Sequence, residues 1–182
     1  MHGSEDDTIG GFNSYIETER KKELNTNVTT ILFDNGYEVL YKRKPINDVK
    51  ELTREEYYVR GSTALLDAIG RTITSLDKEI DNKVLFVIMT DGMENASIEF
   101  SKTQIKNMIE NHTWEFIFIG ADIDSYTEAG HIGIKRTHVA NYRKSRDGFN
   151  RAFRSVENAT MSLRDNISLE ESDWKRELDE YD

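Results

Sequence analysis

The sequence predicts an α/β fold, a three-layer doubly wound sheet that is mostly parallel and carries one antiparallel edge strand. The first indication is the uninterrupted apolar run of residues 84–89, which is typical of a strand buried on both faces of a parallel sheet. The second is the alternation of strand-like and helix-like segments after residue 60. The third is a hairpin signal, Asp34-Asn35-Gly36, between the strand-like runs 28–33 and 37–41.

Length and composition indicate one domain with a short tail. The chain has 182 residues, and we expect a domain over residues 1–164 and an acidic tail over residues 165–182. A net charge of −10 argues against nucleic acid or an anionic membrane as a partner, because both need a basic surface. The absence of cysteine excludes disulfides and thiolate zinc sites, and no apolar run reaches membrane length. We therefore expect a cytoplasmic protein.

Helical spacing predicts the first element over residues 4–23. Ser4 and Asp7 match a capping box at its start, and apolar side chains then follow at helical intervals. Gly10 and Gly11 weaken the helix locally, which indicates a close packing contact with another element.

The rest of the chain alternates in the manner of a doubly wound sheet. A polar loop over residues 44–60, with a short strand or turn near residues 49–52, leads to a helix over residues 63–80 whose apolar residues step by three and four. The elements expected after it are the strand 84–89, a helix 101–111, a strand 114–119, a short helix 124–129, a short edge strand 137–140 and a long helix 145–163.

The tail allows two interpretations. Residues 169–182 carry seven acidic and two basic residues, together with Trp174, Leu178 and Tyr181 at helical spacing. We favour a solvated, frayed end, as is common for charged termini. The alternative is a short amphipathic segment that docks on a partner or on this domain.

A short acidic side chain follows the strand 84–89 directly. Thr90, Asp91 and Gly92 come just beyond it, and in open α/β sheets ligands bind beyond the carboxyl ends of the strands. Asp91 therefore marks a candidate site, with Gly92 letting the backbone turn. The alternative is that Asp91 only caps a helix or stabilises a turn.

Three segments, in order along the chain, resemble one family. Residues 60–69, Arg-Gly-Ser-Thr-Ala-Leu-Leu-Asp-Ala-Ile, look like the Gly-x-Thr-x-Leu-x-x-Ala segment of von Willebrand factor type A (VWA) domains. Residues 87–95 resemble the strand end that carries the family's Thr-Asp-Gly. Residues 116–124 are similar to the following strand in intracellular bacterial and phage members. The resemblance extends to about residue 164 and implies a Rossmann-like sheet.

The resemblance implies a protein-binding module with a metal-ion-dependent adhesion site, and not an enzyme. By match, Thr63 and Asp91 are two of the ligands of Mg²⁺ or Mn²⁺, which accept hard oxygen donors. In this family a carboxylate of the partner protein completes the coordination of the metal. The residues expected to line the binding site beside the two ligands are Gly61, Ser62, Gly92 and Glu94.

The chain departs from the family at its start. The family's first, central strand and its Asp-x-Ser-x-Ser ligands are missing, and Met1 matches the position just after the last serine. With Thr63 and Asp91 alone, we expect weak metal binding or none. We hypothesise a shortened version of a parent with the full site; an upstream reading frame without Asp-x-Ser-x-Ser would count against this. The lost strand leaves unpaired edges, so a strand-swapped dimer or a damaged fold also stays open.

A second class of function stays open as well. Asp91 and Glu94 could form a carboxylate pair in a metal-dependent hydrolase of Rossmann-like fold, although a simpler interpretation is that Glu94 shapes the loop. The four histidines show no metal-ligand spacing, and the motifs of phosphate-binding loops, dinucleotide sites and nucleophile elbows are absent. Phosphoester turnover that is lost on Asp91→Ala would indicate an enzyme, whereas a binding module would show none.

Overall fold

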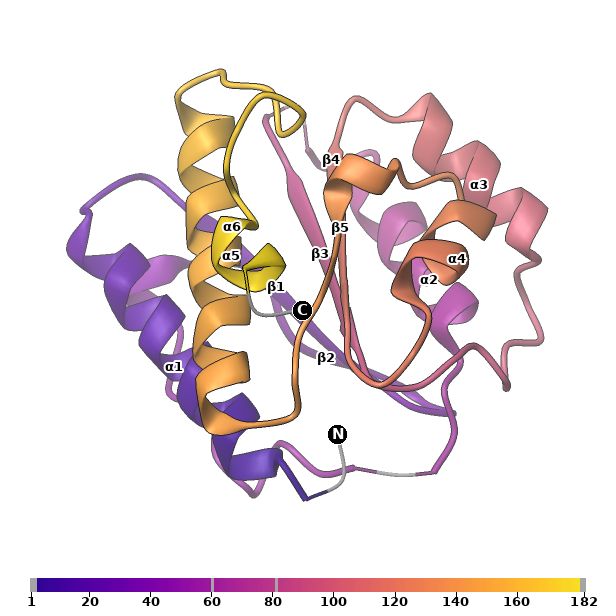
Figure 1. Ribbon diagram of the computed structural model, residues 1–182, viewed down its shortest axis with the longest axis horizontal. Coiled ribbons are helices and arrows are strands. Elements are labelled where there is room, and N and C mark those ends of the chain that lie inside the picture. Colours follow the sequence, from indigo (N-terminus) through magenta and orange to yellow (C-terminus); the bar gives the residue numbers. More distant parts are fainter. Residues whose placement is uncertain (1–2, 60, 81, 181–182) are drawn as a thin grey trace.

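The computed structural model describes residues 3–59, 61–80 and 82–180, and it places helices on both sides of two small sheets (Figure 1). Expectations that fall on Met1, His2, Arg60 and Tyr181 lie outside these residues. The helices are α1 (Glu5–Lys21), α2 (Leu65–Leu76), α3 (Lys102–Asn111), α4 (Ser125–His131), α5 (Arg146–Arg164) and α6 (Arg176–Asp179), with 3-10 turns η1 (Ile46–Asp48) and η2 (Arg136–His138). The strands are β1 (Asn27–Phe33), β2 (Tyr37–Pro45), β3 (Leu85–Thr90), β4 (Glu115–Gly120) and β5 (Val139–Asn141). In this part of the chain no helix is both long and apolar enough to span a bilayer.

The strands form two separate sheets. β1 and β2 pair antiparallel, and Gly36 N donates to Asp34 Oδ1 at 2.5 Å in the turn between them, which confirms the predicted hairpin. β3, β4 and β5 form a parallel sheet in that order. No ladder joins β1 to β3 among the described residues. The α/β class is therefore confirmed, with the hairpin standing apart from the parallel strands.

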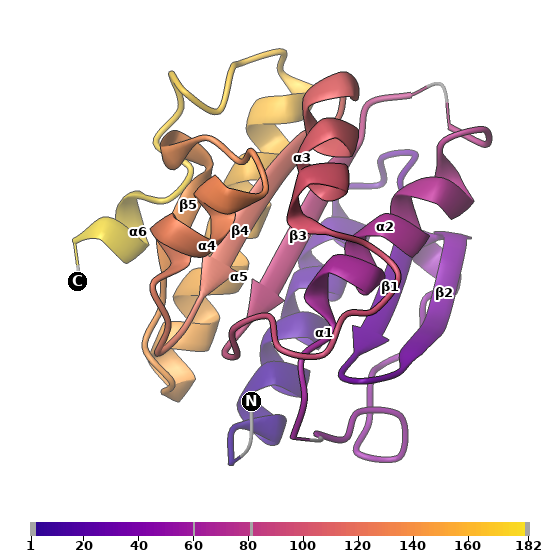
Figure 2. The ribbon, with the colours of Figure 1, turned by 90° about the vertical axis from the view of Figure 1, so that its right-hand side faces the viewer.

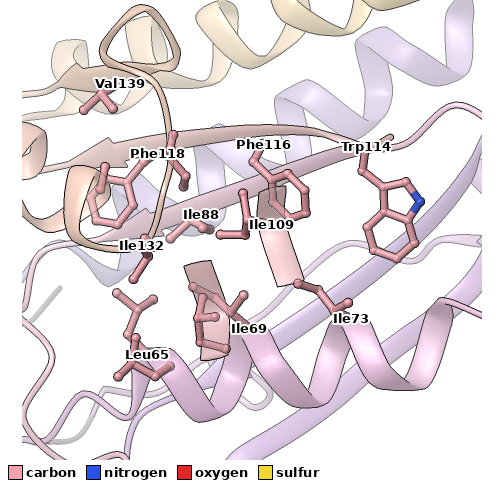
Figure 3. Packing of buried hydrophobic residues seen from close by; sticks show 14 of the residues in the cluster. Leu65, Ile69, Ile73, Ile88, Ile109, Trp114, Phe116, Phe118, Ile132 and Val139 are labelled. Atoms are coloured by element: carbon pink, nitrogen blue, oxygen red, sulfur yellow. The ribbon is translucent and has the colours of Figure 1, made fainter. Parts of the chain in front are cut away.

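β4 separates two hydrophobic cores. Successive side chains of a strand point to opposite faces, so Phe116 and Phe118 pack toward α2, α3 and α4, while Ile117 and Ile119 pack toward α5. Figure 3 shows the first core, in which Ile69 of α2 lies opposite the strands. The second core also takes in part of α1, and Figure 2 shows the two helix layers with the parallel strands between them.

Two helix starts differ from expectation. Ser4 occupies the N-cap position of α1, but its side chain makes no capping bond, and Thr8 Oγ1 instead donates to Ser4 O at 2.9 Å. The capping box predicted there is wrong, whereas Ser101 and Gln104 form one at α3. α2 begins later than predicted because Ala64 still has non-helical dihedral angles.

α1 packs on α5 through a glycine. A Cβ built on Gly11 would overlap the Phe153 ring, whereas a Cβ on Gly10 would meet nothing within 4 Å. The close contact predicted for this pair is therefore confirmed at Gly11.

Residues 49–52 have no regular secondary structure, so the short strand considered there does not form.

The acidic carboxyl-terminal segment packs against the domain. Trp174 Nε1 donates to Thr137 O at 3.1 Å. Lys175 Nζ donates to Val139 O at 2.7 Å, so side chains satisfy carbonyl groups beside the outer strand β5. The favoured interpretation of a solvated end is wrong for residues 165–180, and docking on this domain is confirmed. The side chains of the segment that are buried in the second core are Leu169, Trp174 and Leu178.

Replacing Trp174 with Ala should lower the free energy of unfolding by roughly 3–5 kcal/mol, because the indole is 1% exposed and its loss leaves a cavity. Urea unfolding followed by circular dichroism measures the change. Ile98→Ala is the control, since this side chain is 91% exposed and its truncation should alter stability by no more than about 0.5 kcal/mol. Equal stability of the two variants would mean that the segment is not docked in solution.

Replacing Gly11 with Ala should destabilise the protein by about 1–3 kcal/mol, because the new methyl group must displace the Phe153 ring. Gly10→Ala, one position earlier in the same helix and free of contacts, should instead stabilise it by about 0.5–1 kcal/mol. Thermal unfolding of both variants compares them directly. The contact between α1 and α5 is refuted if Gly11→Ala proves as stable as Gly10→Ala.

Candidate functional site

Two of the loops singled out in the sequence meet where β3 ends. Thr63 N donates to Asn95 Oδ1 at 2.9 Å, and Asn95 N donates to Thr63 O at 3.0 Å. A Cβ on Gly92 would lie 2.5 Å from Thr63 Oγ1, so only glycine allows this approach. Gly61 and Ser62 belong to the same loop as Thr63, and Gly61 is exposed. The Thr63 side chain therefore lies against the tip of the loop that follows β3.

Glu94 holds the loop after β3 against α2. Its Oε2 accepts from Leu66 N at 3.0 Å and from Ser97 Oγ at 2.7 Å, and its Oε1 accepts from Ser97 N at 2.8 Å. Asp67 of α2 binds the same loop by accepting from the successive amides of residues 98–100. Both oxygens of Glu94 are engaged, which supports the interpretation that this residue shapes the loop.

An ammonium group bridges two carboxylates at the ends of β3 and β4. Lys144 Nζ lies 2.9 Å from Asp91 Oδ2 and 3.0 Å from Asp122 Oδ2. Burial alone would raise the pKa of Asp91, but positive charge that includes Lys144 outweighs burial and lowers it. Asp91 is therefore ionised and paired at neutral pH. We call the edge formed by Thr63, Asp91, Asp122 and Lys144 the carboxyl rim.

Two residues of the carboxyl rim, Asp122 and Lys144, are not among the sequence-based candidates. Lys144 follows β5 as Asp91 follows β3 and as Asp122 follows β4. Because parallel strands end at one edge of a sheet, the rule that marks Asp91 applies equally to Lys144. The positive charge of Lys144 does not distinguish it in the sequence, because several other basic residues lie in the same segment.

Two tyrosines lie near the Asp91 carboxylate. Burial raises the pKa of Tyr57 to about 12, and burial also raises the pKa of Tyr142, with the negative charge of Asp91 adding to both. The Tyr142 hydroxyl is buried and has no hydrogen-bond partner within the described part of the chain. Both phenols are neutral at ordinary pH, so their chemistry at the rim is restricted to hydrogen bonding.

The residues at the rim do not fit a complete divalent-cation site. Among residues 3–59, 61–80 and 82–180, no group of three or more Asp, Glu or His side chains is placed to hold a metal ion. Thr63 and Asp91 offer one hydroxyl and one carboxylate, and Lys144 already neutralises that carboxylate. Mg²⁺ demands near-octahedral oxygen coordination, for which this donor set is too small.

The described histidines are engaged separately. His112 Nε2 lies 2.9 Å from Asp77 Oδ1 at the surface. His138 is buried near β4, and burial lowers its pKa. His131 lies in the exposed last turn of α4. No two of these three share a metal-binding group within the described residues.

Comparisons with known proteins bear on the fold alone. No protein-family model matches the chain, and no curated protein matches it. Among solved structures, proximal thread matrix protein 1 from the mussel byssus is similar, with a TM-score of 0.60 and 12% sequence identity. The match covers 88% of this chain and 40% of the mussel chain, so the chain spans less than half the length of that protein. At this identity the likeness shows a shared fold and says nothing about activity.

Replacing Lys144 with Met should raise the pKa of Asp91. Burial favours the protonated acid, and removal of the ammonium takes away part of the positive charge that opposes burial. An NMR titration of the Asp91 carboxyl carbon measures the shift. Lys106→Met is the matched control, because Lys106 contacts Glu110 on the exposed surface of α3 and should leave Asp91 unchanged. Equal shifts in both variants would rule out a specific ion pair.

The same substitution should change how stability depends on pH. A depressed folded-state pKa adds stability that is present above the unfolded value, near 3.8, and is lost as the pH falls through the folded value. Lys144→Met should therefore lower the free energy of unfolding at neutral pH and flatten its decline below about pH 4. Urea unfolding at several pH values measures both effects, and a profile identical to that of the intact chain would contradict them.

Proposed function

We propose that the chain is a protein-binding domain of the von Willebrand factor type A kind, with a doubly wound, Rossmann-like fold. The binding site is the carboxyl rim, and the partner is a protein that presents a carboxylate. The observation that carries the proposal is the approach of Thr63 to the loop tip at Gly92. Both loops are already held in place by hydrogen bonds, and a preordered surface loses little entropy on binding.

The contacts of the two acids favour binding over metal-dependent hydrolysis. A general acid or base works best when its pKa lies near the operating pH. Burial acts to raise the pKa of Asp91, but the neighbouring positive charge outweighs it and keeps the carboxyl ionised. Glu94, the second acid of the hydrolase alternative, uses both oxygens to hold the loop. Neither side chain is therefore free to exchange protons with a substrate at neutral pH.

In this proposal Lys144 opposes metal binding at Asp91. A Mg²⁺ or Mn²⁺ ion at Asp91 would compete with the ammonium for the same carboxylate and would be repelled by it. The Lys144 side chain is 28% exposed, and its ammonium can donate a charge-assisted hydrogen bond to a partner's carboxylate. In this proposal a partner carboxylate takes the place of Asp122, whose side chain is 65% exposed, as the second contact of the ammonium.

Partner capture tests the proposal. The immobilised chain should retain a partner protein from cell extract, and Thr63→Val and Lys144→Gln should each weaken capture by about tenfold or more, since a hydrogen bond to a charged group contributes roughly 1.5–3 kcal/mol. Asp173→Asn, an exposed change outside the rim, is the control and should capture normally. Retention of the same protein by both rim variants would refute the rim as the binding site.

Metal titration and an activity assay separate the two classes of function. Calorimetric titration of the intact chain with MgCl₂ or MnCl₂ should show little heat, and phosphoester substrates should not be turned over with either metal. Turnover that needs the metal and disappears in Asp91→Ala would replace the binding proposal with the hydrolase.

A further inference from the structure

A large groove separates the hairpin from the parallel sheet. Its volume is about 1100 Å³, and all of β1 and all of β3 line it. α2 forms one wall, and α1 and α5 together form the opposite wall. Figure 2 shows β1 and β3 facing each other across this space with helices on either side.

β1 and β3 run in the same direction. At their amino ends, Arg164 Nη2 donates to Thr26 Oγ1 at 2.8 Å, and Lys83 Nζ donates to Leu163 O at 2.8 Å, so both strands start beside the end of α5. At their carboxyl ends, Ala64 N donates to Asp34 O at 2.6 Å, next to the Thr63 contact described above. The two strands therefore begin at one edge and end at the carboxyl rim, as Figure 2 shows.

The facing edges of β1 and β3 lack ladder partners. Within the described residues β1 pairs with β2 alone and β3 pairs with β4 alone. Helices cover both faces of β3, yet most of its side chains stay partly exposed, whereas β4 is buried over nearly its whole length. Backbone groups in such a covered place are costly to leave unpaired. Because helices cover both faces of β3 and all of its residues line the groove, its side chains are exposed toward the groove.

The volume of the groove leaves room for a single strand. Six residues of β-strand are about 20 Å long, strands lie about 4.8 Å apart, and stacked layers lie about 10 Å apart, which gives about 960 Å³. The groove, at about 1100 Å³, is large enough to hold such a strand. Since the walls on both sides are helices with apolar residues facing inward, the strand that fits must be apolar on both faces.

α1 is placed to continue such a strand. Glu19, near the end of α1, pairs with Arg164 at 2.6 Å, so α1 ends where β1 begins and starts at the carboxyl rim. The connection β3–α3–β4 crosses the sheet in one direction, with its helix on the α2 side. A groove strand followed by α1 and β1 would cross in the opposite direction, with its helix on the opposite face. The two connections then have the same hand, as the right-handed rule requires.

We propose that the groove is the seat of one extended strand of about six apolar residues, parallel to β1 and β3, that leads directly into α1. It would join the two sheets into one with the order β2-β1-groove strand-β3-β4-β5. Counted along the chain from the added strand, this is the order 3-2-1-4-5-6 of doubly wound folds. The carboxyl end of the strand would arrive beside Asp91 and Thr63, which both line the groove.

Hydrogen exchange of an extended chain tests the proposal. A six-residue strand of alternating Val and Ile, joined to the amino end by a short turn, should slow amide exchange in β1 and β3 by about tenfold or more while the protein stays monomeric. The first control carries Ser and Asp in place of Val and Ile. The second carries the apolar strand at the carboxyl end, with the same linker. Neither control should protect β1 and β3.

Three results would overturn the proposal. Unchanged exchange in the extended chain would show that the groove takes no strand. Protection found only in a dimer would assign the groove to a second copy of the chain, and equal protection from the carboxyl-terminal extension would remove the link to α1. The 182-residue chain gives a check that needs no variant: if its β1 and β3 amides already exchange as slowly as those of β4, the edges are not open.

Discussion

The structure depends on the burial of β4, the strand that has a partner on both edges and a hydrophobic core on both faces. Its aromatic side chains fill one core, and its isoleucines fill the other. This arrangement fixes the direction of β3 and β5, because parallel partners must run with β4. It therefore also fixes which edge of the sheet carries the loops with Asp91, Asp122 and Lys144. The polar site is a consequence of how the apolar strand packs.

The carboxyl rim is ordered by carboxylates that accept backbone amides. Asp67 and Glu94 between them bind the loop that follows β3, and neither is left facing solvent with free oxygens. Buried acids are tolerated when donors surround them, and such contacts fix the backbone as well as the side chain. Asp91, three residues before Glu94, is held differently, because the ammonium of Lys144 from a distant segment pairs with it. The rim thus combines a rigid loop with one ion-paired acid.

Sequence patterns with local causes were predictable, and contacts between distant segments were not. The hairpin at Asp34–Gly36 and the position of Asp91 after β3 follow from turn chemistry and from apolar periodicity. Lys144 reaches Asp91 across the ends of two strands, which no local pattern encodes. The docking of the carboxyl-terminal segment does not follow from its acidic composition, which favours solvation, because the buried indole of Trp174 outweighs that charge. The capping box does not form at Ser4, where the third residue is Asp7, whose side chain is shorter than the Glu or Gln of the motif; it forms at Ser101, where that residue is Gln104.

The two ion pairs of Lys144, with Asp91 and with Asp122, differ in how far water reaches the carboxylate. The Asp91 side chain is 16% exposed and the Asp122 side chain is 65% exposed. Dissolved ions screen exposed charges far more than buried ones, so added salt weakens the ion pair between Lys144 and Asp122 first. At high ionic strength the ammonium should therefore keep its contact with Asp91 longer than its contact with Asp122.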